Sequence, residues 1–169
     1  MKAKTLLTPL RYFILFFLQA ICVFVFAQKA LVKFDHLQTN DGLSQSNVFC
    51  ILQDSRGFMW FGTRDGLNKY DGYKFTIYKY DESNKGSLSD NTIQDITEDS
   101  DGNLWLATWG GGFDMFDRAK EKFVRHKAEI KKQAVNGSKL INSVLYSSDG
   151  SLWIGTEGQG LPGQPKKYS

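Results

Sequence analysis

The chain has 169 residues, of which 41% are hydrophobic and 14% aromatic, and its formal net charge is +3. The three basic residues Lys2, Lys4 and Arg11 account for the whole excess, and the chain past Ala27 is formally neutral. Nucleic-acid binding usually needs a clustered basic face. Nucleic acid is therefore excluded as an expected partner.

An apolar segment, residues 12–26, follows the three basic residues and leads to the small residue Ala27. This pattern predicts a secretory signal peptide over residues 1–27, cleaved after Ala27. The mature chain is therefore expected in the periplasm or outside the cell. One alternative is an uncleaved segment that anchors the chain in a membrane. Another is a lipoprotein signal at Cys22, which the bulky Ile21 before it disfavours.

Three segments of nearly the same sequence follow, each with a glycine turn and then a tryptophan, an apolar residue, a small residue and a threonine. They are Asp54–Thr63, Asp99–Thr108 and Ser147–Thr156. The tryptophans Trp60, Trp105 and Trp153 are 45 and then 48 residues apart. This period is typical of one propeller blade or of a pair of solenoid helices.

The pattern inside each repeat favours strands over helices. A glycine-bearing turn follows each threonine, and further strand-like runs come after it in the first two copies. These runs are Leu67–Tyr70, Phe75–Tyr80, Phe113–Asp117 and Lys122–His126. Four short strands in about 45 residues are typical of a four-stranded propeller blade.

An apolar pair opens each repeat, but its members lie three residues apart rather than two. The pairs are Val48/Ile51, Ile93/Ile96 and Ile141/Val144. This spacing indicates a β-bulge or an innermost strand buried on both faces, and a single helical turn remains an alternative.

The predicted fold is all-β: a partial β-propeller of about two and a half four-stranded blades after the signal peptide. The predicted segments are a leading strand segment (28–42), repeat 1 (43–87), repeat 2 (88–135), a partial repeat 3 (136–161) and a non-repeat tail (162–169). Two prolines in the tail cannot continue a central strand. An unclosed array leaves blade edges open, so we expect self-association or pairing with another propeller piece.

The first repeat, from Leu43-Ser44 through Asp54, Gly57 and Trp60 to Gly66-Leu67, resembles the two-component regulator propeller repeat. The resemblance covers about residues 32–161. It implies the N-terminal periplasmic sensor part of a Bacteroidetes-type hybrid two-component system. In that family further blades, an immunoglobulin-like domain, a membrane span, a histidine kinase and a DNA-binding regulator follow.

After Leu161 the chain departs from the family pattern, because a third strand equivalent to Phe113–Asp117 is missing. We therefore expect a truncated or interrupted member of the family. It would be a fragment of a ligand-sensing, carbohydrate-sensing propeller without kinase and DNA-binding parts. The alternatives are a fragment of a secreted propeller enzyme, a hydrolase or lyase, and the product of an interrupted gene with no function of its own.

Positions that differ between the copies are the candidates for ligand binding. Arg64, Trp109 and Glu157 each follow the shared threonine, in a loop that opens on the face where propellers usually hold ligands. An indole, a guanidinium and a carboxylate on one rim suit an oligosaccharide. Shared positions are expected to be scaffold, and they are Trp60, Trp105, Trp153, Gly57, Gly102 and Gly150.

The inventory of catalytic and metal-binding groups is thin, so we expect no enzyme activity and no metal or cofactor. His36 and His126 lie far apart, and neither has metal-ligand spacing. Asp99 and Asp101 faintly resemble a calcium loop, but the position of its bidentate glutamate is a glycine. Cys50, the one cysteine left after signal cleavage, is expected to be a small buried hydrophobe.

Overall fold

The computed structural model of the protein describes residues 12–14, 16, 34–126, 140–157 and 166–167. The chain divides into two compact units, residues 1–36 and 37–169, and every assigned strand lies in the second. Most of the predicted signal peptide, residues 1–27, lies outside the described residues, although residues 12–14 and 16 are helical. Among the described residues, no helix has the length and hydrophobicity that crossing a membrane requires.

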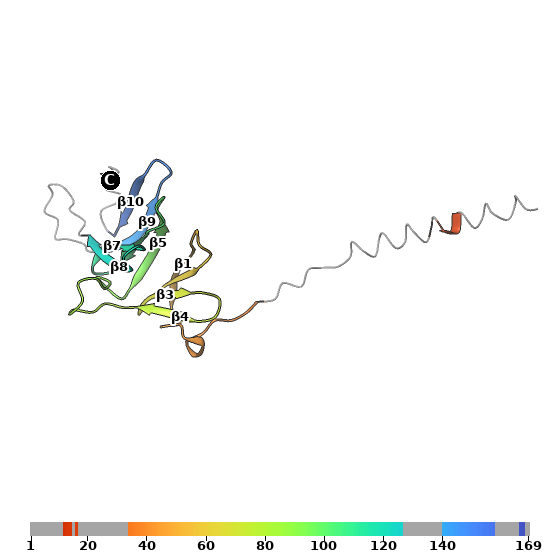
Figure 1. The fold of residues 1–169 in the computed structure, drawn as a ribbon, viewed down its shortest axis with the longest axis horizontal. Coiled ribbons are helices and arrows are strands. Elements are labelled where there is room, and N and C mark those ends of the chain that lie inside the picture. Colours follow the sequence, from red (N-terminus) through yellow and green to blue (C-terminus); the bar gives the residue numbers. More distant parts are fainter. Residues whose placement is uncertain (1–11, 15, 17–33, 127–139, 158–165, 168–169) are drawn as a thin grey trace, which may run out of the picture. The chain divides into compact units, whose positions relative to one another are not determined.

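The second unit contains two four-stranded antiparallel sheets and part of a third, each built from strands that follow one another in the chain (Figure 1). The first sheet consists of β1 (Val48–Gln53), β2 (Met59–Thr63), β3 (Gly66–Tyr70) and β4 (Phe75–Tyr78). The second consists of β5 (Ile93–Glu98), β6 (Leu104–Thr108), β7 (Gly112–Asp117) and β8 (Lys122–His126). The third contains β9 (Ile141–Tyr146), β10 (Ser151–Thr156) and β11 (Lys166–Lys167). A 3-10 helix, η1 (Thr39–Asp41), precedes β1.

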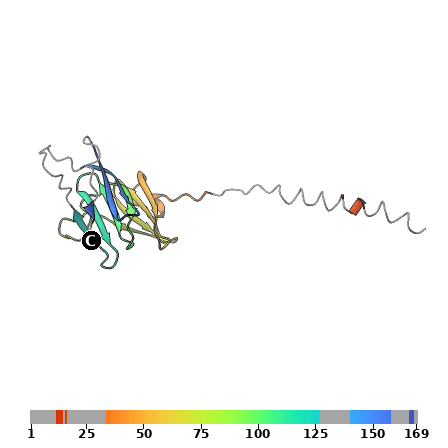
Figure 2. The same cartoon turned by 90° about the horizontal axis from the view of Figure 1, so that it is seen from above.

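The sheets are arranged as successive blades. Strand β5 contacts both β1 and β9, so the first strands of neighbouring sheets lie side by side. Figure 2 shows the yellow, green and blue sheets in the same order from above. First strands that share an axis are a feature of propellers. The predicted all-β, partial propeller fold is confirmed.

A β-bulge explains the three-residue spacing of the apolar pairs. Between Val48 and Cys50 the pairing of β1 with β2 shifts by one residue, so Phe49 is the extra residue. The same shift occurs at Gln94 in β5 and at Asn142 in β9. One inserted residue brings positions i and i+3 to the same face. The bulge interpretation is confirmed, and the alternative of a helical turn is wrong.

The hydrophobic cores lie between sheets. Trp60 and Leu67 pack with a group from the second sheet that includes Ile93 and Ile96. One repeat later, Trp105 packs against the third sheet at Ile141 and Val144 together with Leu152. Trp60 and Trp105 are 1% and 4% exposed, whereas Trp153 is 38% exposed. Each tryptophan therefore depends for its burial on the sheet that follows it.

The predicted tail contributes to the third sheet. Lys166 and Lys167 form the two-residue strand β11, which pairs antiparallel with Ser151 and Leu152 of β10. They occupy the edge of β10 where β3 and β7 lie in the first two sheets. The other residues of the tail, 162–165, 168 and 169, lie outside the described residues.

Candidate functional site

The end of each sheet where the second strand meets the third is called the rim here. In the first two sheets, a threonine at the end of the second strand shapes it. The hydroxyl groups of Thr63 and Thr108 donate to the carbonyl oxygens of Gly66 and Gly112 at 2.9 and 2.8 Å. Both threonines are fully buried. These bonds fix the turn into the third strand and hold the residue after each threonine at the end of its sheet.

The three predicted ligand-binding residues share one backbone contact. Each donates its N–H to the carbonyl oxygen of the residue before the first strand of its own sheet. These bonds are Arg64 to Asn47 at 3.3 Å, Trp109 to Thr92 at 3.0 Å and Glu157 to Leu140 at 3.2 Å. Arg64, Trp109 and Glu157 therefore lie at equivalent positions at the same end of three neighbouring sheets.

The structure brings Arg64 and Trp109 together through Thr92. The Thr92 hydroxyl donates to the carbonyl oxygen of Arg64 at 3.3 Å, while the Thr92 carbonyl accepts from Trp109. The Glu157 N–H donates to the carbonyl oxygen of Leu140. Leu140 has no hydroxyl group, so it cannot form the side-chain hydrogen bond that Thr92 forms with Arg64. Arg64 and Glu157 are exposed, and the Trp109 side chain is 42% exposed. Arg64 and Trp109 thus form the better-defined part of the rim.

Two equivalent buried polar groups lie beneath the rim. In the first sheet, Asn68 accepts from the Ser44 N–H at 2.8 Å, and its amide nitrogen donates to the Ser44 hydroxyl at 2.8 Å. In the second sheet, Asp114 accepts from the Ser89 N–H at 2.7 Å. Asn68 and Asp114 are both fully buried.

Asp114 differs from Asn68 in its charge. Burial raises the pKa of Asp114 to about 6, against the opposing effects of the Ser89 hydrogen bonds and the Arg125 charge. Its Oδ1 has no hydrogen-bond partner among the described residues. Sequence reasoning missed this group. The sequence signal that points to it is an aspartate in the second repeat at the position where the first repeat has the asparagine Asn68.

The opposite end of each sheet carries the glycine turn before the tryptophan. Gly57, Gly102 and Gly150 have φ values of 87°, 81° and 83°, in the left-handed region that glycine adopts readily. Asp99 accepts N–H groups of Asp101 and Asn103 through one oxygen and the Trp105 indole N–H through the other. Both oxygens of the Asp99 carboxylate therefore accept hydrogen bonds from the turn and from the tryptophan that follows it. The described residues contain no group of three or more metal ligands.

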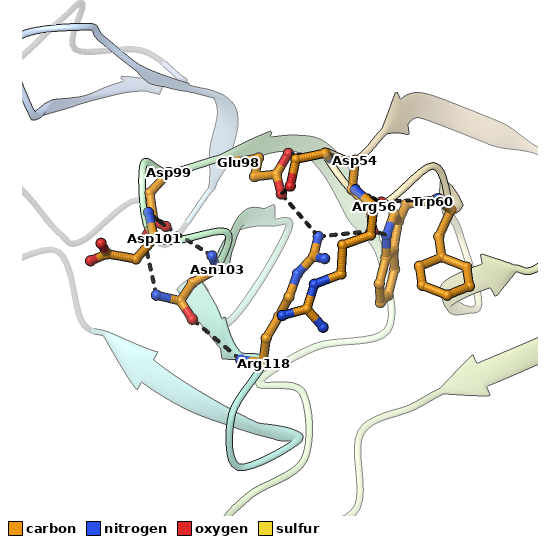
Figure 3. A network of polar contacts seen from close by, with 10 residues as sticks. Asp54, Arg56, Trp60, Glu98, Asp99, Asp101, Asn103 and Arg118 are labelled. Atoms are coloured by element: carbon orange, nitrogen blue, oxygen red, sulfur yellow. Dashed lines mark hydrogen bonds and ion pairs between the residues drawn. The ribbon is translucent and has the colours of Figure 1, made fainter.

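Asp54 forms the same turn in the first sheet and a further ion pair with the second (Figure 3). Its Oδ2 accepts from the Trp60 indole at 2.6 Å and from Arg118 Nη2 at 2.8 Å. Arg118 Nη2 also lies 3.2 Å from Glu98. Burial would raise the pKa of Asp54, but hydrogen bonds from Trp60 and Phe58 and the charge of Arg118 hold it below its usual value.

Cys50 lies between the first and second sheets. Its side chain packs, half-buried, against the core that contains Trp60 and Ile93. Burial, followed by the charge of Asp95, raises the pKa of this thiol to about 12. A thiol with such a pKa stays protonated and unreactive at neutral pH.

A family model described as "Two component regulator propeller" matches three parts of the chain, residues 42–65, 87–110 and 137–158. Each match contains one glycine turn and the whole of the tryptophan strand after it. A relative named Histidine kinase P4, from Formosa agariphila, is 48% identical over 63 residues. That alignment covers 37% of this chain and 5% of the relative.

Two solved structures share the fold. An extracellular domain from B. thetaiotaomicron, ascribed to the hybrid two component system BT4673, is 26% identical with a TM-score of 0.60. The match covers 76% of this chain and 18% of that one. PorZ, a surface component of the type-IX secretion system of Porphyromonas gingivalis, is 23% identical with a TM-score of 0.52, covering 68% and 17%. The chain thus spans less than a fifth of the length of each of these relatives.

Proposed function

We propose that this chain, which matches the two component regulator propeller family over residues 42–65, 87–110 and 137–158, is part of a sensor outside the cytoplasm whose rim binds an oligosaccharide. The B. thetaiotaomicron structure is named an extracellular domain of a hybrid two component system, which supports this location. The predicted signal peptide over residues 1–27 agrees with it. The role proposed for the chain is recognition of a ligand, not its chemical conversion.

The observation that carries the proposal is Trp109. Its indole is 42% exposed at the rim, whereas Trp60 and Trp105 are buried between sheets. An exposed indole has an apolar face on which a sugar ring can stack. The backbone of Arg64 is linked to that of Trp109 through Thr92, and the Arg64 guanidinium can donate charged hydrogen bonds to hydroxyl or carboxylate groups of the sugar. Glu157 adds an acceptor at the equivalent position of the third sheet.

Replacing Trp109 with alanine is expected to weaken oligosaccharide binding at least tenfold, because truncating an aromatic anchor removes more than about 1.4 kcal/mol of binding free energy. Isothermal titration calorimetry of the full chain with a panel of neutral and acidic oligosaccharides measures the affinity.

Tyr73→Ala is the matched control. Tyr73 is 95% exposed in the turn between β3 and β4, at the end of the sheet away from Gly66. This variant is expected to bind as the wild type does. Equal affinities for the wild type and Trp109→Ala would contradict the rim as the binding site. Failure of the whole panel to bind would contradict the ligand class.

A further inference from the structure

The face of each sheet that is turned toward the preceding sheet is apolar, and we call it the leading face. In the second sheet six residues of this face pack in the core shared with the first sheet, and each is at most 7% exposed. They are Ile93, Ile96, Leu104, Leu106, Phe116 and Phe123. The third sheet repeats this arrangement with Ile141, Val144 and Leu152, all at most 5% exposed.

The leading face of the first sheet has the same apolar character but is not buried. Strand pairing places six residues at the positions equivalent to those of the second sheet, and they are Val48, Ile51, Met59, Phe61, Tyr70 and Phe75. Five of the six are half-buried and Ile51 is exposed. Ile51 is 62% exposed, whereas the equivalent Ile96 is 7% exposed. A contiguous apolar face of this kind indicates an interaction surface.

The two interfaces inside the chain show which surface covers a leading face. On the sheet before it, a tryptophan is followed two residues later by a small residue. In the first sheet these are Trp60 and Gly62, and a Cβ atom at Gly62 would lie 2.9 Å from Ile93 Cγ2. In the second sheet they are Trp105 and Ala107, which pack with Ile141. At Gly62 the absence of a Cβ atom leaves room both for Ile93 of the next sheet and for the Cys50 thiol of the same sheet.

The third sheet carries the same pattern, and among the described residues no further sheet packs on it. Trp153 is followed two residues later by Gly155. Trp153 is 38% exposed and Leu145, its neighbour across β9 and β10, is 60% exposed. In the described part of the chain, the first sheet therefore presents a partly exposed leading face, and the third sheet presents the kind of surface that covers leading faces elsewhere in the chain.

We propose that two copies of this chain associate head to tail, with the leading face of the first sheet of one copy packed against Trp153 and Gly155 of the other. The contact would repeat the geometry of the two interfaces inside the chain. It joins two different patches and is therefore heterologous, so it either closes on itself or adds copies in a row. It uses sheet faces and leaves the rim with Arg64 and Trp109 free, so it is independent of the proposed ligand binding.

Sedimentation velocity of the full chain over a range of concentrations tests the association. The wild type is expected to form species larger than the monomer, in a proportion that rises with concentration. Ile51→Asp and Trp153→Asp are each expected to be monomeric, because each places a charge in the contact. Val124→Asp is the control: Val124 is 40% exposed on β8, outside both patches, and this variant should associate as the wild type does.

A mixture of the two monomeric variants distinguishes the head-to-tail contact from others. The Ile51→Asp chain keeps the patch around Trp153, and the Trp153→Asp chain keeps the leading face, so a 1:1 mixture is expected to form pairs that do not grow further. Circular dichroism confirms that each variant keeps its strands. A monomeric wild type at all concentrations, continued association of Trp153→Asp, or no pairing in the mixture of folded variants would each overturn the proposal.

Discussion

Replacing Arg118 with alanine is expected to lower the free energy of unfolding by about 3–5 kcal/mol, because it leaves a buried carboxylate without its cation. The side chain of Arg118 is 6% exposed and that of Asp54 is fully buried. Their atoms lie 2.8 Å apart, and the Arg118 guanidinium also lies 6.0 Å from the centre of the Trp60 ring. The arginine follows β7 in the second sheet, whereas Asp54 follows β1 in the first. The pair therefore joins two sheets.

Urea denaturation followed by tryptophan fluorescence measures this loss. Lys120→Ala provides a matched control two residues along the chain. Lys120 pairs with Asp117 at 2.6 Å, but its side chain is 74% exposed. Exposed ion pairs contribute about 0–1 kcal/mol, so this variant is expected to unfold close to the wild type. An equal, small loss in both variants would contradict the assignment of Arg118 as the cation that stabilises the interface.

The strands, turns and bulges of this chain could be predicted from the sequence because they depend on neighbouring residues. A glycine with positive φ fixes each turn before a tryptophan strand, and a pair of apolar residues three apart indicated each bulge. These features repeat in each copy. A pattern that occurs three times in register distinguishes blades from helices even without the structure.

Burial could not be predicted in the same way, because it depends on what each sheet packs against. Ile51 and Ile96 occupy equivalent positions and are the same residue type, yet one is 62% exposed and the other 7%. The three tryptophans were expected to be equivalent scaffold residues, but Trp153 remains partly exposed. In a repeat array, each face acquires its environment from its neighbour.

The interactions between sheets were the least predictable part of the site. Arg118 and Asp54 are 64 residues apart, and the first repeat has Gly72 at the position that Arg118 occupies in the second. A comparison of repeats finds residues that recur, so it cannot find a residue that occurs once and reaches across an interface. Arg64 and Trp109 were predicted as variable rim residues, but the Thr92 link between them became visible only in the structure.

The second large effect is expected at Asp114, where Asp114→Asn should stabilise the protein at pH 7 and have little effect at pH 4. Burial raises the pKa of Asp114 from its ordinary value of 3.8 to about 6. Below pH 3.8 the carboxyl is neutral in both the folded and the unfolded chain, so its ionisation does not lower the free energy of unfolding. Between pH 3.8 and about 6 the unfolded chain ionises first, and the folded state loses stability as the pH rises. Above pH 6 the loss reaches about 3 kcal/mol.

The first sheet shows why an amide fits this position. Asn68, the residue equivalent to Asp114, donates from its amide nitrogen to the Ser44 hydroxyl and, at 3.4 Å, to the carbonyl oxygens of Phe61 and Gly66. Asp114 Oδ1 corresponds to that nitrogen but cannot donate when it is ionised. The groups that face Asp114 include the cation Arg125 from β8 and the anion Asp90 from the loop before β5. Their opposing charges leave burial as the dominant effect on its pKa.

Chemical denaturation of the wild type and Asp114→Asn at pH values from 4 to 7.5 tests this expectation. The difference in the free energy of unfolding between the two proteins should be small at pH 4 and should rise to about 3 kcal/mol near pH 7. Asn68→Asp is the reverse variant, and it should lose stability over a similar pH range because it places a carboxylate in the equivalent buried position. Measuring differences between proteins cancels the contribution of Asp54, whose lowered pKa gives the opposite dependence, a loss of stability as the pH falls. A difference that stays constant from pH 4 to 7.5 would mean that Asp114 does not titrate in this range, and Arg125 would then be the group that keeps it charged.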